Sequence, residues 1–294
     1  MKLINSIMAV LLALCITGCS GGEKKSVVVA SKPHTEQFIL AEMISQLIEK
    51  HSQIKVERKF GIGGGTANIH PAMVKGEIDI YPEYTGTGWL YVLKREPLAD
   101  AQEVYQKVSD EYHRQFNIKW LGMYGFNNTY ALSVPKELAE KWHLETFSDL
   151  AQYSNRMTLG AEYDFFERED GYNGMARAYG FQFKGRKDMD IGLKYEAIKS
   201  GQVDVINAFS TDGQLQQYQM KVLRDDRNYF PTYYAATLVR EETLKKFPEL
   251  ENVLNRLRGQ INDQEMTEMN YQVEIAKKEP SAVAKQFLQR KGLL

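Results

Sequence analysis

Short apolar runs and helical repeats of apolar residues alternate along this chain, which is the pattern of an α/β fold. Residues 27–30 form a β-branched run, and residues 35–50 carry their apolar side chains on one helical face. Residues 54–60 alternate as a strand does, 66–75 can form a second helix, and 77–81 have the composition of a third strand. The first part of the chain therefore predicts a strand–helix repeat.

The same order of elements recurs in the second half of the chain. The expected elements are a strand at 157–160, a helix at 171–179, an extended run at 181–186, a helix at 191–199 and a strand at 202–205.

Residues 72–80 resemble residues 197–205 position by position, and the same offset places Tyr84 on Phe209. Each half then has an aromatic ring just past the carboxyl end of an equivalent strand, where open α/β sheets bind ligands. We therefore expect the two rings to face each other across a cleft. Chance similarity within a common strand pattern is the alternative.

Two crossings are expected between two lobes. Residues 124–134 lead from the first lobe to the second, and residues 233–239 return, because everything after residue 241 is helical and offers no strands to complete the second lobe. The predicted domains are lobe 1, made of 27–127 plus 234–294, and lobe 2, made of 128–233. Two crossings permit hinge closure over a ligand.

The N-terminal segment predicts export. Lys2 precedes an apolar run over residues 3–14, too short to span a bilayer, and the run ends on Ile-Thr-Gly-Cys at Cys19, which resembles a bacterial lipobox. We expect a signal peptide at 1–18 and a lipidated tether at 19–26, which would anchor the exported protein to a bacterial membrane, at the cell surface or on the periplasmic face. A buried helix carrying a free cysteine is the alternative.

Composition and motifs exclude several classes of function. The net charge is -1 and the pI about 6.6, so the chain lacks the basic field of a nucleic-acid binder. Its five histidines and two cysteines show no metal-ligand spacing, the glycine run 61–66 is not followed by the lysine of a phosphate-binding loop, and no nucleophile elbow occurs. We expect no enzyme activity, no catalytic residue, no cofactor and no metal. A lipoprotein hydrolase using cleft carboxylates such as Glu83 is a less favoured alternative.

Aromatic residues at predicted strand ends and crossings indicate a binding function. The four positions are Tyr84, Tyr130, Phe209 and Tyr233. A quaternary ammonium group has a diffuse charge and no N–H to donate, so proteins hold it with ring faces. Taken singly each ring could belong to the core, but the set at matched positions favours a cage.

Five segments carry a resemblance to a known family. They are Ser-Lys-Pro-His-Thr-Glu-Gln (31–37), Gly-Glu-Ile-Asp-Ile-Tyr-Pro-Glu-Tyr-Thr-Gly-Thr (76–87), Tyr-Gly-Phe-Asn-Asn-Thr-Tyr (124–130), Asp-Gly-Tyr (170–172) and Phe-Ser-Thr-Asp-Gly (209–213). Together they resemble the glycine betaine/choline/carnitine-binding lipoproteins of osmoprotectant ABC importers. The resemblance implies a two-lobed type II periplasmic-binding-protein fold, a ligand held between the lobes, and an ABC permease as partner.

The resemblance also implies roles for individual residues. The family's cage tyrosines are matched by Tyr84, Tyr130 and Tyr233. The positions that hold the carboxylate of a betaine are matched by Lys32, Thr87 and Arg168. Asn128 falls where a backbone carbonyl is expected to face the cation. Phe209 departs from the family, which commonly has tyrosine there, so a hydroxyl is missing from the cage.

Charge suggests which ligand is preferred. Lys32 and Arg168 would repel choline, whose only charge is positive, and favour a zwitterion with a carboxylate of its own. The alternatives are a solvated loop lysine and a surface ion pair of Arg168 with Glu167 or Glu169. We therefore expect a monomeric solute-binding subunit for glycine betaine, with carnitine or choline as further candidates. A bulkier betaine such as ergothioneine, or an aromatic amino acid, is the alternative ligand.

Overall fold

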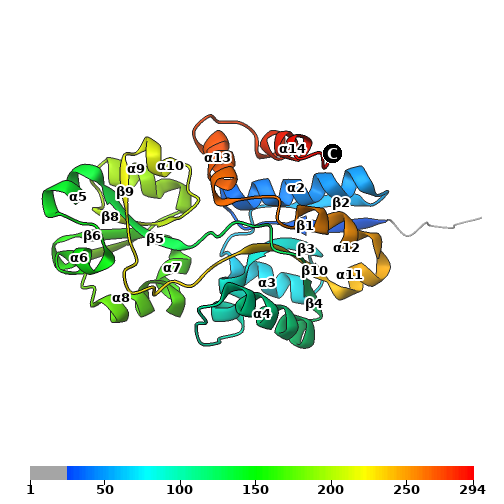
Figure 1. The fold of residues 1–294 in the computed structure, drawn as a ribbon, viewed down its shortest axis with the longest axis horizontal. Helices are drawn as coiled ribbons and strands as arrows, with labels where there is room; N and C mark the ends of the chain where they lie inside the picture. The colour runs from blue at the N-terminus through cyan, green and yellow to red at the C-terminus, as the bar shows by residue number, and fades with distance from the viewer. Residues whose placement is uncertain (1–24) are drawn as a thin grey trace, which may run out of the picture.

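Two five-stranded sheets, each covered by helices on both faces, form two lobes in the computed structural model, which describes residues 25–294 (Figure 1). The sheet of lobe 1 has the order β2-β1-β3-β10-β4. Its strands are β1 (Ser26–Ala30), β2 (Lys55–Lys59), β3 (Ile80–Tyr84), β4 (Ile118–Trp120) and β10 (Ala235–Arg240). The sheet of lobe 2 has the order β7-β6-β8-β5-β9. Its strands are β5 (Tyr130–Pro135), β6 (Thr158–Ala161), β7 (Gly185–Asp188), β8 (Val205–Phe209) and β9 (Met220–Leu223).

The two sheets repeat one arrangement. In lobe 1, β1 pairs in parallel with β2 and β3 while β10 runs antiparallel to β3; in lobe 2, β6 pairs in parallel with β7 and β8 while β5 runs antiparallel to β8. Strands β3 and β8 lie at the offset that the sequence comparison used. The predicted α/β fold with two lobes is confirmed.

Two strands begin later than the sequence predicted. Residues 77–79 and 202–204 precede β3 and β8, and the strands continue through Tyr84 and Phe209. Pro82, a residue typical of a strand end, lies inside β3, opposite Thr237 of the antiparallel neighbour β10. The two aromatic residues are therefore the last residues of their strands rather than the first residues beyond them.

Helices complete both lobes. Those of lobe 1 are α2 (Thr35–His51), α3 (Thr66–Val74), a π-type turn (Thr87–Val92), α4 (Ala101–Phe116), α11 (Glu241–Lys246), α12 (Glu249–Leu254), a 3-10 turn (Asn255–Leu257), α13 (Asp263–Glu274) and α14 (Pro280–Arg290). Those of lobe 2 are α5 (Lys136–Trp142), α6 (Phe147–Ala151), a 3-10 turn (Ser154–Arg156), α7 (Tyr163–Glu167), a π-type turn (Glu169–Asn173), α8 (Gly174–Tyr179), a 3-10 turn (Ile191–Leu193), α9 (Lys194–Lys199) and α10 (Gln214–Gln217). The helix predicted at 171–179 is thus a π-type turn followed by α8.

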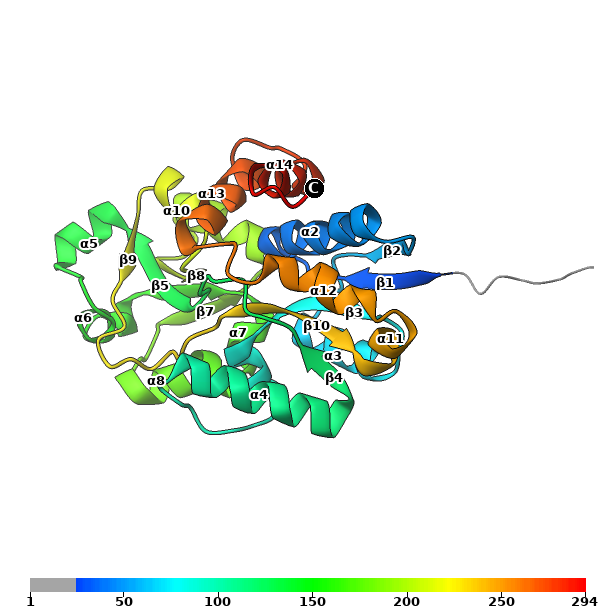
Figure 2. The ribbon, with the colours of Figure 1, turned by 45° about the vertical axis from the view of Figure 1, so that its right-hand side comes forward.

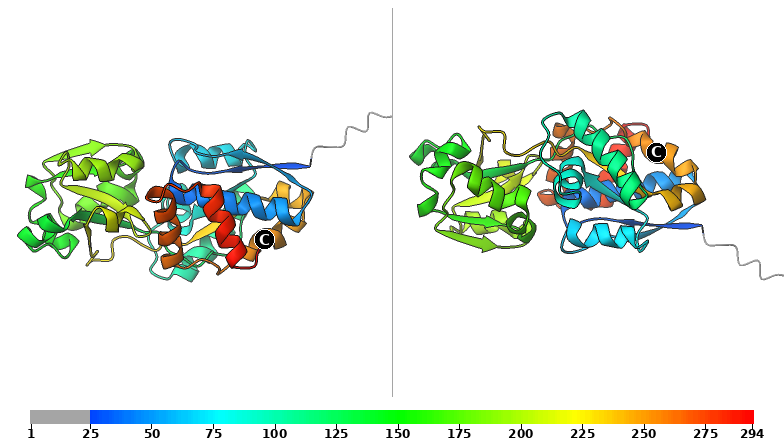
Figure 3. Two further views of the ribbon diagram at one scale, coloured as in Figure 1. Left: turned by 90° about the horizontal axis from the view of Figure 1, so that it is seen from above. Right: turned by 90° about the horizontal axis from the view of Figure 1, so that it is seen from below.

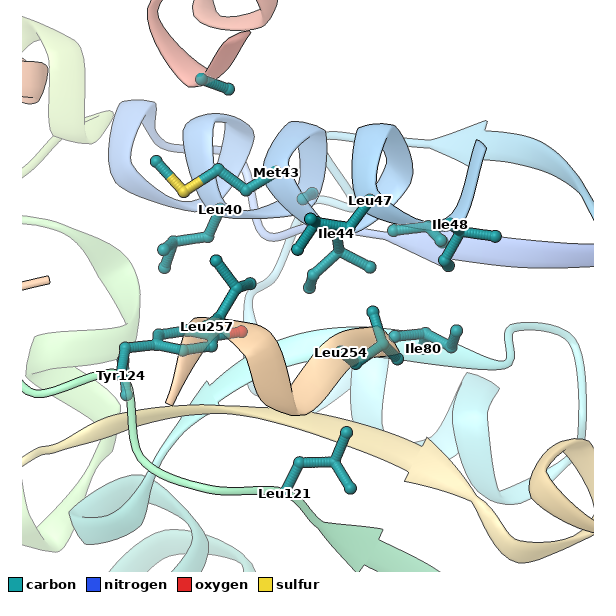
Figure 4. Packing of buried hydrophobic residues seen from close by; sticks show 14 of the residues in the cluster. Leu40, Met43, Ile44, Leu47, Ile48, Ile80, Leu121, Tyr124, Leu254 and Leu257 are labelled. Carbon is teal, nitrogen blue, oxygen red and sulfur yellow. The ribbon is translucent and has the colours of Figure 1, made fainter. Parts of the chain in front are cut away.

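Helix α2 is the centre of the largest hydrophobic cluster of lobe 1. Its apolar face carries Ile44, Leu47 and Ile48, which are fully buried and lie toward Leu254 and Ile80 (Figure 4). Glu36 in its first turn and basic residues in its last turn complement the helix dipole. The C-terminal helices α12, α13 and α14 pack around α2, so the end of the chain belongs to the structure of lobe 1.

Two extended segments connect the lobes, and they run side by side. One follows β4 and enters β5, and the other follows β9 and enters β10 (Figure 2). They pair through a bridge between Asn127 and Tyr234, and the Asn128 amide donates to the Tyr233 carbonyl over 3.1 Å. We propose lobe boundaries after residues 127 and 233, within this paired region.

The predicted signal peptide, and Cys19 with most of the predicted tether, lie outside the described residues. Ser26, which was expected to belong to the tether, is instead the first residue of β1. No helix among residues 25–294 combines the length and the apolar character needed to cross a membrane.

Candidate functional site

A cavity of about 810 Å³ lies between the lobes. All of the predicted ligand-binding residues line it: Lys32, Tyr84 and Thr87 from lobe 1, Asn128 and Tyr233 from the two crossings, and Tyr130, Arg168 and Phe209 from lobe 2. Each of them except Tyr130 and Phe209 is buried, and those two are partly exposed. Residues far apart in the sequence therefore meet in one place, and their roles in binding remain predictions.

Aromatic rings form one wall of the cavity around Tyr130. Its ring centroid lies 5.8 Å from that of Tyr233 in an edge-to-face arrangement and 5.3 Å from that of Phe209. Burial raises the pKa of Tyr84, Tyr130 and Tyr233, so their phenols stay neutral. Neutral rings at these separations provide electron-rich faces for a cation.

Three of the four predicted cage rings already face a cation of the protein. Lys32 Nζ lies 5.2 Å from the Tyr84 centroid, and the Arg168 guanidinium lies 5.9 Å from that of Tyr130. Lys194 Nζ lies 4.8 Å from the Phe209 centroid and is held there by Glu162. Each of these three cations is paired with a carboxylate of the protein, so the rings face compensated charges.

Lys32 is a buried, paired lysine and not the solvated loop lysine of the alternative interpretation. Its side chain is 8% exposed, and Nζ lies 2.5 Å from Oε1 of Glu83, which is fully buried. Glu83 also accepts hydrogen bonds from the Thr66 hydroxyl over 3.1 Å and from the Tyr84 amide over 2.8 Å. Burial lowers the pKa of Lys32, and the Glu83 carboxylate opposes that effect.

Arg168 is equally buried and is paired with Asp170. Its Nε donates to Oδ1 over 2.8 Å and its Nη2 donates to Oδ2, while the Tyr233 hydroxyl donates to the same Oδ2 over 3.0 Å. The alternative interpretation, a surface pair with Glu167 or Glu169, is wrong, since the side chain is 5% exposed and its partner is Asp170. Asp170 thus orients two predicted ligand-binding residues.

These pairs correct the charge argument made from the sequence. Each predicted carboxylate-binding cation has a carboxylate of the protein beside it, so the site does not carry two uncompensated positive charges. Repulsion of choline by such charges therefore fails as a reason for ligand preference. The spare N–H groups of Lys32 and Arg168, and not their net charge, are what a ligand carboxylate could use.

Asn128 and Thr87 complete the lining. Asn128 donates its amide Nδ2 to Glu36 over 2.7 Å, and its Oδ1 has no hydrogen-bond partner among residues 25–294. Thr87 is 4% exposed and begins the π-type turn after β3. The backbone-carbonyl role expected for Asn128 stays a prediction.

Comparisons with known proteins show the family of this chain. The family described as the substrate binding domain of ABC-type glycine betaine transport systems matches residues 25–290. The chain belongs to this family. It is therefore an extracytoplasmic binding protein of a quaternary-ammonium ABC importer, from a family of transport proteins and not of enzymes, which removes the hydrolase alternative.

Two relatives and one solved structure illustrate the likeness. The ergothioneine transport permease/ergothioneine binding protein EgtU of Helicobacter pylori is 48% identical over 92% of this chain, which spans about half (48%) of that protein. The carnitine transport binding protein OpuCC of Listeria monocytogenes is 37% identical over 97% of the chain and 94% of its own length. A crystal structure of a glycine betaine/carnitine/choline ABC transporter protein, 36% identical, superposes with a TM-score of 0.73 over 91% of this chain and 99% of its own. The predicted type II periplasmic-binding-protein fold is confirmed.

Sequence reasoning missed the groups that pair with or pack against the predicted ligand-binding residues. They are Glu36, Asp170, Glu162, Lys194 and His34. Glu36, His34 and Asp170 lie inside the segments that carry the family resemblance, which was a usable signal. Lys194 offered none, because a lysine at the start of a short helix is usually exposed. Within residues 25–294 no cluster of acidic, histidine or cysteine side chains is arranged to hold a metal ion.

His34 makes the stability of the folded protein depend on pH. Its ring stacks near Phe209, with centroids 6.2 Å apart, and burial, reinforced by the charges of Lys32 and Lys194, lowers its pKa to about 3. The unfolded chain takes up a proton at this histidine near pH 6.5, whereas the folded protein does not, so protons favour unfolding in that window. The free energy of unfolding therefore decreases as the pH falls from about 6.5 toward 3.

We expect His34→Asn to remove the contribution of His34 to this decrease. Urea denaturation from pH 7 to pH 4 measures the unfolding free energy of the parent protein and of the variant. As the pH falls, the unfolding free energy of the parent should decrease more than that of the variant. Both proteins contain the other titrating groups, so the contributions of those groups cancel in the difference between the two unfolding free energies. A difference that stays constant over this range contradicts the lowered pKa.

Proposed function

We propose that this chain captures a zwitterionic quaternary-ammonium betaine between its lobes and presents it to an ABC permease. The convergence of all predicted ligand-binding residues on one interlobe cavity is the observation that supports this proposal. The rings of Tyr84, Tyr130 and Tyr233 surround the trimethylammonium group, and closure of the lobes excludes water from it.

The ligand carboxylate binds to N–H groups that the protein leaves free. Arg168 has five N–H donors and directs one edge of its guanidinium at Asp170, while Lys32 has three and directs one at Glu83. The remaining edge of Arg168 can take a second carboxylate. Asp170 and Glu83 hold these donors in place before the ligand arrives, which lowers the entropic cost of binding.

Ergothioneine is the ligand we favour. It is a betaine that also carries a planar, sulfur-bearing imidazole ring, and the relative that is 48% identical is named as an ergothioneine binding protein. The cavity, at about 810 Å³, extends from the cage to the segment 188–193 and has room for a ligand larger than glycine betaine. Phe209 beside the His34 ring provides an aromatic wall without a hydroxyl.

Glycine betaine or carnitine is the second candidate. The matching family is described by glycine betaine transport, and the relative that is 37% identical is named as a carnitine binding protein. Both ligands would use the same cage and the same carboxylate donors. We further propose that Cys19 is lipidated after cleavage at 18 and that the protein acts as a monomer beside its permease.

Titration calorimetry with ergothioneine, glycine betaine and choline tests the ligand assignment. We expect ergothioneine to bind with a Kd of about 1 μM, or about -8 kcal/mol, glycine betaine at least tenfold more weakly, and choline more weakly still. Tighter binding of glycine betaine would select the second candidate, and tighter binding of choline would remove Lys32 and Arg168 from the site. Binding of none of the three would overturn the proposed function.

Tyr84→Ala should weaken betaine binding by ~1–3 kcal/mol, from the lost ring face and its buried area. Tyr153→Ala is the matched control, because Tyr153 is a partly exposed tyrosine that does not line the cavity. Calorimetry of both variants measures the difference. Equal affinities for Tyr84→Ala and the parent protein would remove Tyr84 from the cage.

A further inference from the structure

One buried carboxylate, Glu36, receives hydrogen bonds from four separate parts of the molecule. Its Oε1 accepts from the Tyr84 hydroxyl and from Asn128 Nδ2, each over 2.7 Å. Its Oε2 accepts from the Thr211 hydroxyl over 2.6 Å and from Asn270 Nδ2 over 3.2 Å. Glu36 is 3% exposed and does not line the ligand cavity.

The four donors join lobe 1, a crossing, lobe 2 and a C-terminal helix. Tyr84 ends β3, Asn128 lies on the first crossing, Thr211 follows β8 in lobe 2, and Asn270 belongs to α13. All four are uncharged, and the carboxylate lies in the first turn of α2, where the helix dipole favours a negative charge. A carboxylate accepting from four neutral donors is fully satisfied only while all four stay in place.

Helix α13 reaches across the lobe boundary at this point. Asn270 Nδ2 also donates to the Thr211 carbonyl over 2.9 Å, and a Cβ atom added at Gly213 would lie 2.4 Å from the Tyr271 amide nitrogen. The turn after β8 is therefore in direct backbone contact with α13, which lies at the boundary of the two lobes in both views of Figure 3. This contact joins the lobes in addition to the two crossings.

We propose that Glu36 is a positioning residue that couples the cage to lobe closure. This inference rests on the proposed function, because it makes Tyr84 and Asn128 the residues through which Glu36 acts. When Thr211 and lobe 2 are in the closed arrangement, the carboxylate is satisfied and holds the Tyr84 ring and the Asn128 amide in their binding geometry. Movement of lobe 2 that withdraws Thr211 leaves a buried carboxyl oxygen short of one donor, which favours return to the arrangement in which Thr211 contacts Glu36.

Two variants separate coupling from simple orientation of the ring. Thr211→Val keeps the side-chain shape and removes the lobe 2 donor without touching the cavity, and Glu36→Gln replaces two acceptor sites by N–H groups. Glu42→Gln is the matched control on the same helix, since Glu42 is paired with Arg58 at the surface. Each purified full chain is titrated with ergothioneine and glycine betaine, and the radius of gyration is measured without ligand by small-angle X-ray scattering.

We expect Glu36→Gln to weaken ligand binding about tenfold or more and Thr211→Val about threefold to tenfold, with Glu42→Gln unchanged. Thr211→Val should also increase the radius of gyration of the ligand-free protein. Normal affinity and normal dimensions of Thr211→Val would overturn the coupling, even if Glu36→Gln is impaired or fails to fold. If the parent protein binds neither ligand, the proposed function fails, while the scattering comparison still tests whether Glu36 and Thr211 hold the lobes together.

Discussion

Arg168→Ala should reduce betaine affinity by about 3–5 kcal/mol and shift the preference of the site toward choline. The variant removes the donors that we assign to the ligand carboxylate and leaves the carboxylate of Asp170 buried beside Tyr233 without its cation. The site thereby changes from a compensated pair to a net negative charge. A negative charge repels a betaine carboxylate and attracts choline.

Calorimetry with glycine betaine and choline measures this shift as the ratio of the two affinities. Arg177→Ala is the matched control, because Arg177 is also an ion-paired arginine of lobe 2 but is 68% exposed beside Glu169. The control should leave both affinities unchanged. If Arg168→Ala weakened the binding of glycine betaine and of choline equally, the arginine would support the fold of the cavity and would not bind the ligand carboxylate.

Lys194→Met should lower the unfolding free energy by about 3–5 kcal/mol. The lysine is fully buried under Phe209, with Nζ 3.1 Å from Glu162 Oε2 and 3.2 Å from Asn207 Oδ1. Methionine fills a similar volume, so the cost arises from the Glu162 carboxylate, which keeps the Asn207 amide as its one hydrogen-bond partner within residues 25–294. Urea denaturation of the two proteins gives the difference.

Lys221→Met is the control for this prediction. Lys221 pairs with Glu145 over 2.6 Å, but its side chain is 36% exposed and that of Glu145 is 70% exposed, so its loss should change stability by less than about 1 kcal/mol. Addition of Glu162→Gln to Lys194→Met removes the uncompensated charge and should restore part of the lost stability. A loss below 1 kcal/mol for Lys194→Met alone contradicts the assigned pair.

Periodicity predicted the architecture because the same local pattern of strands and helices occurs once in each lobe. The offset that placed Tyr84 on Phe209 corresponds to two equivalent strands, β3 and β8, each of which ends on the aromatic residue. The four aromatic positions were also accessible from sequence, since they lie at strand ends and a crossing, where α/β folds place ligands. The roles of Lys32, Thr87, Asn128 and Arg168 were predicted from the family resemblance alone. Strand limits were less accurate, since β3 and β8 both begin later than predicted and both continue through their aromatic residue.

The partners of the charged residues could not be predicted in the same way. Lys32 and Glu83 are 51 positions apart, and Thr211 lies 175 positions from Glu36. No local pattern relates such residues, because the pairing depends on how two strands and a helix meet in three dimensions. As a result, the sequence suggested free cations at Lys32 and Arg168, whereas the structure shows compensated pairs and, beneath the cage, the carboxylate of Glu36.

A crystal structure of the protein with ergothioneine tests the central claim most directly. The trimethylammonium group should lie within about 6 Å of the ring centroids of Tyr84, Tyr130 and Tyr233, with the ligand carboxylate on the free edge of Arg168. The Asp170 and Glu36 contacts should persist. A ligand bound outside the interlobe cavity, or one whose ammonium group contacts none of these rings, would contradict the account.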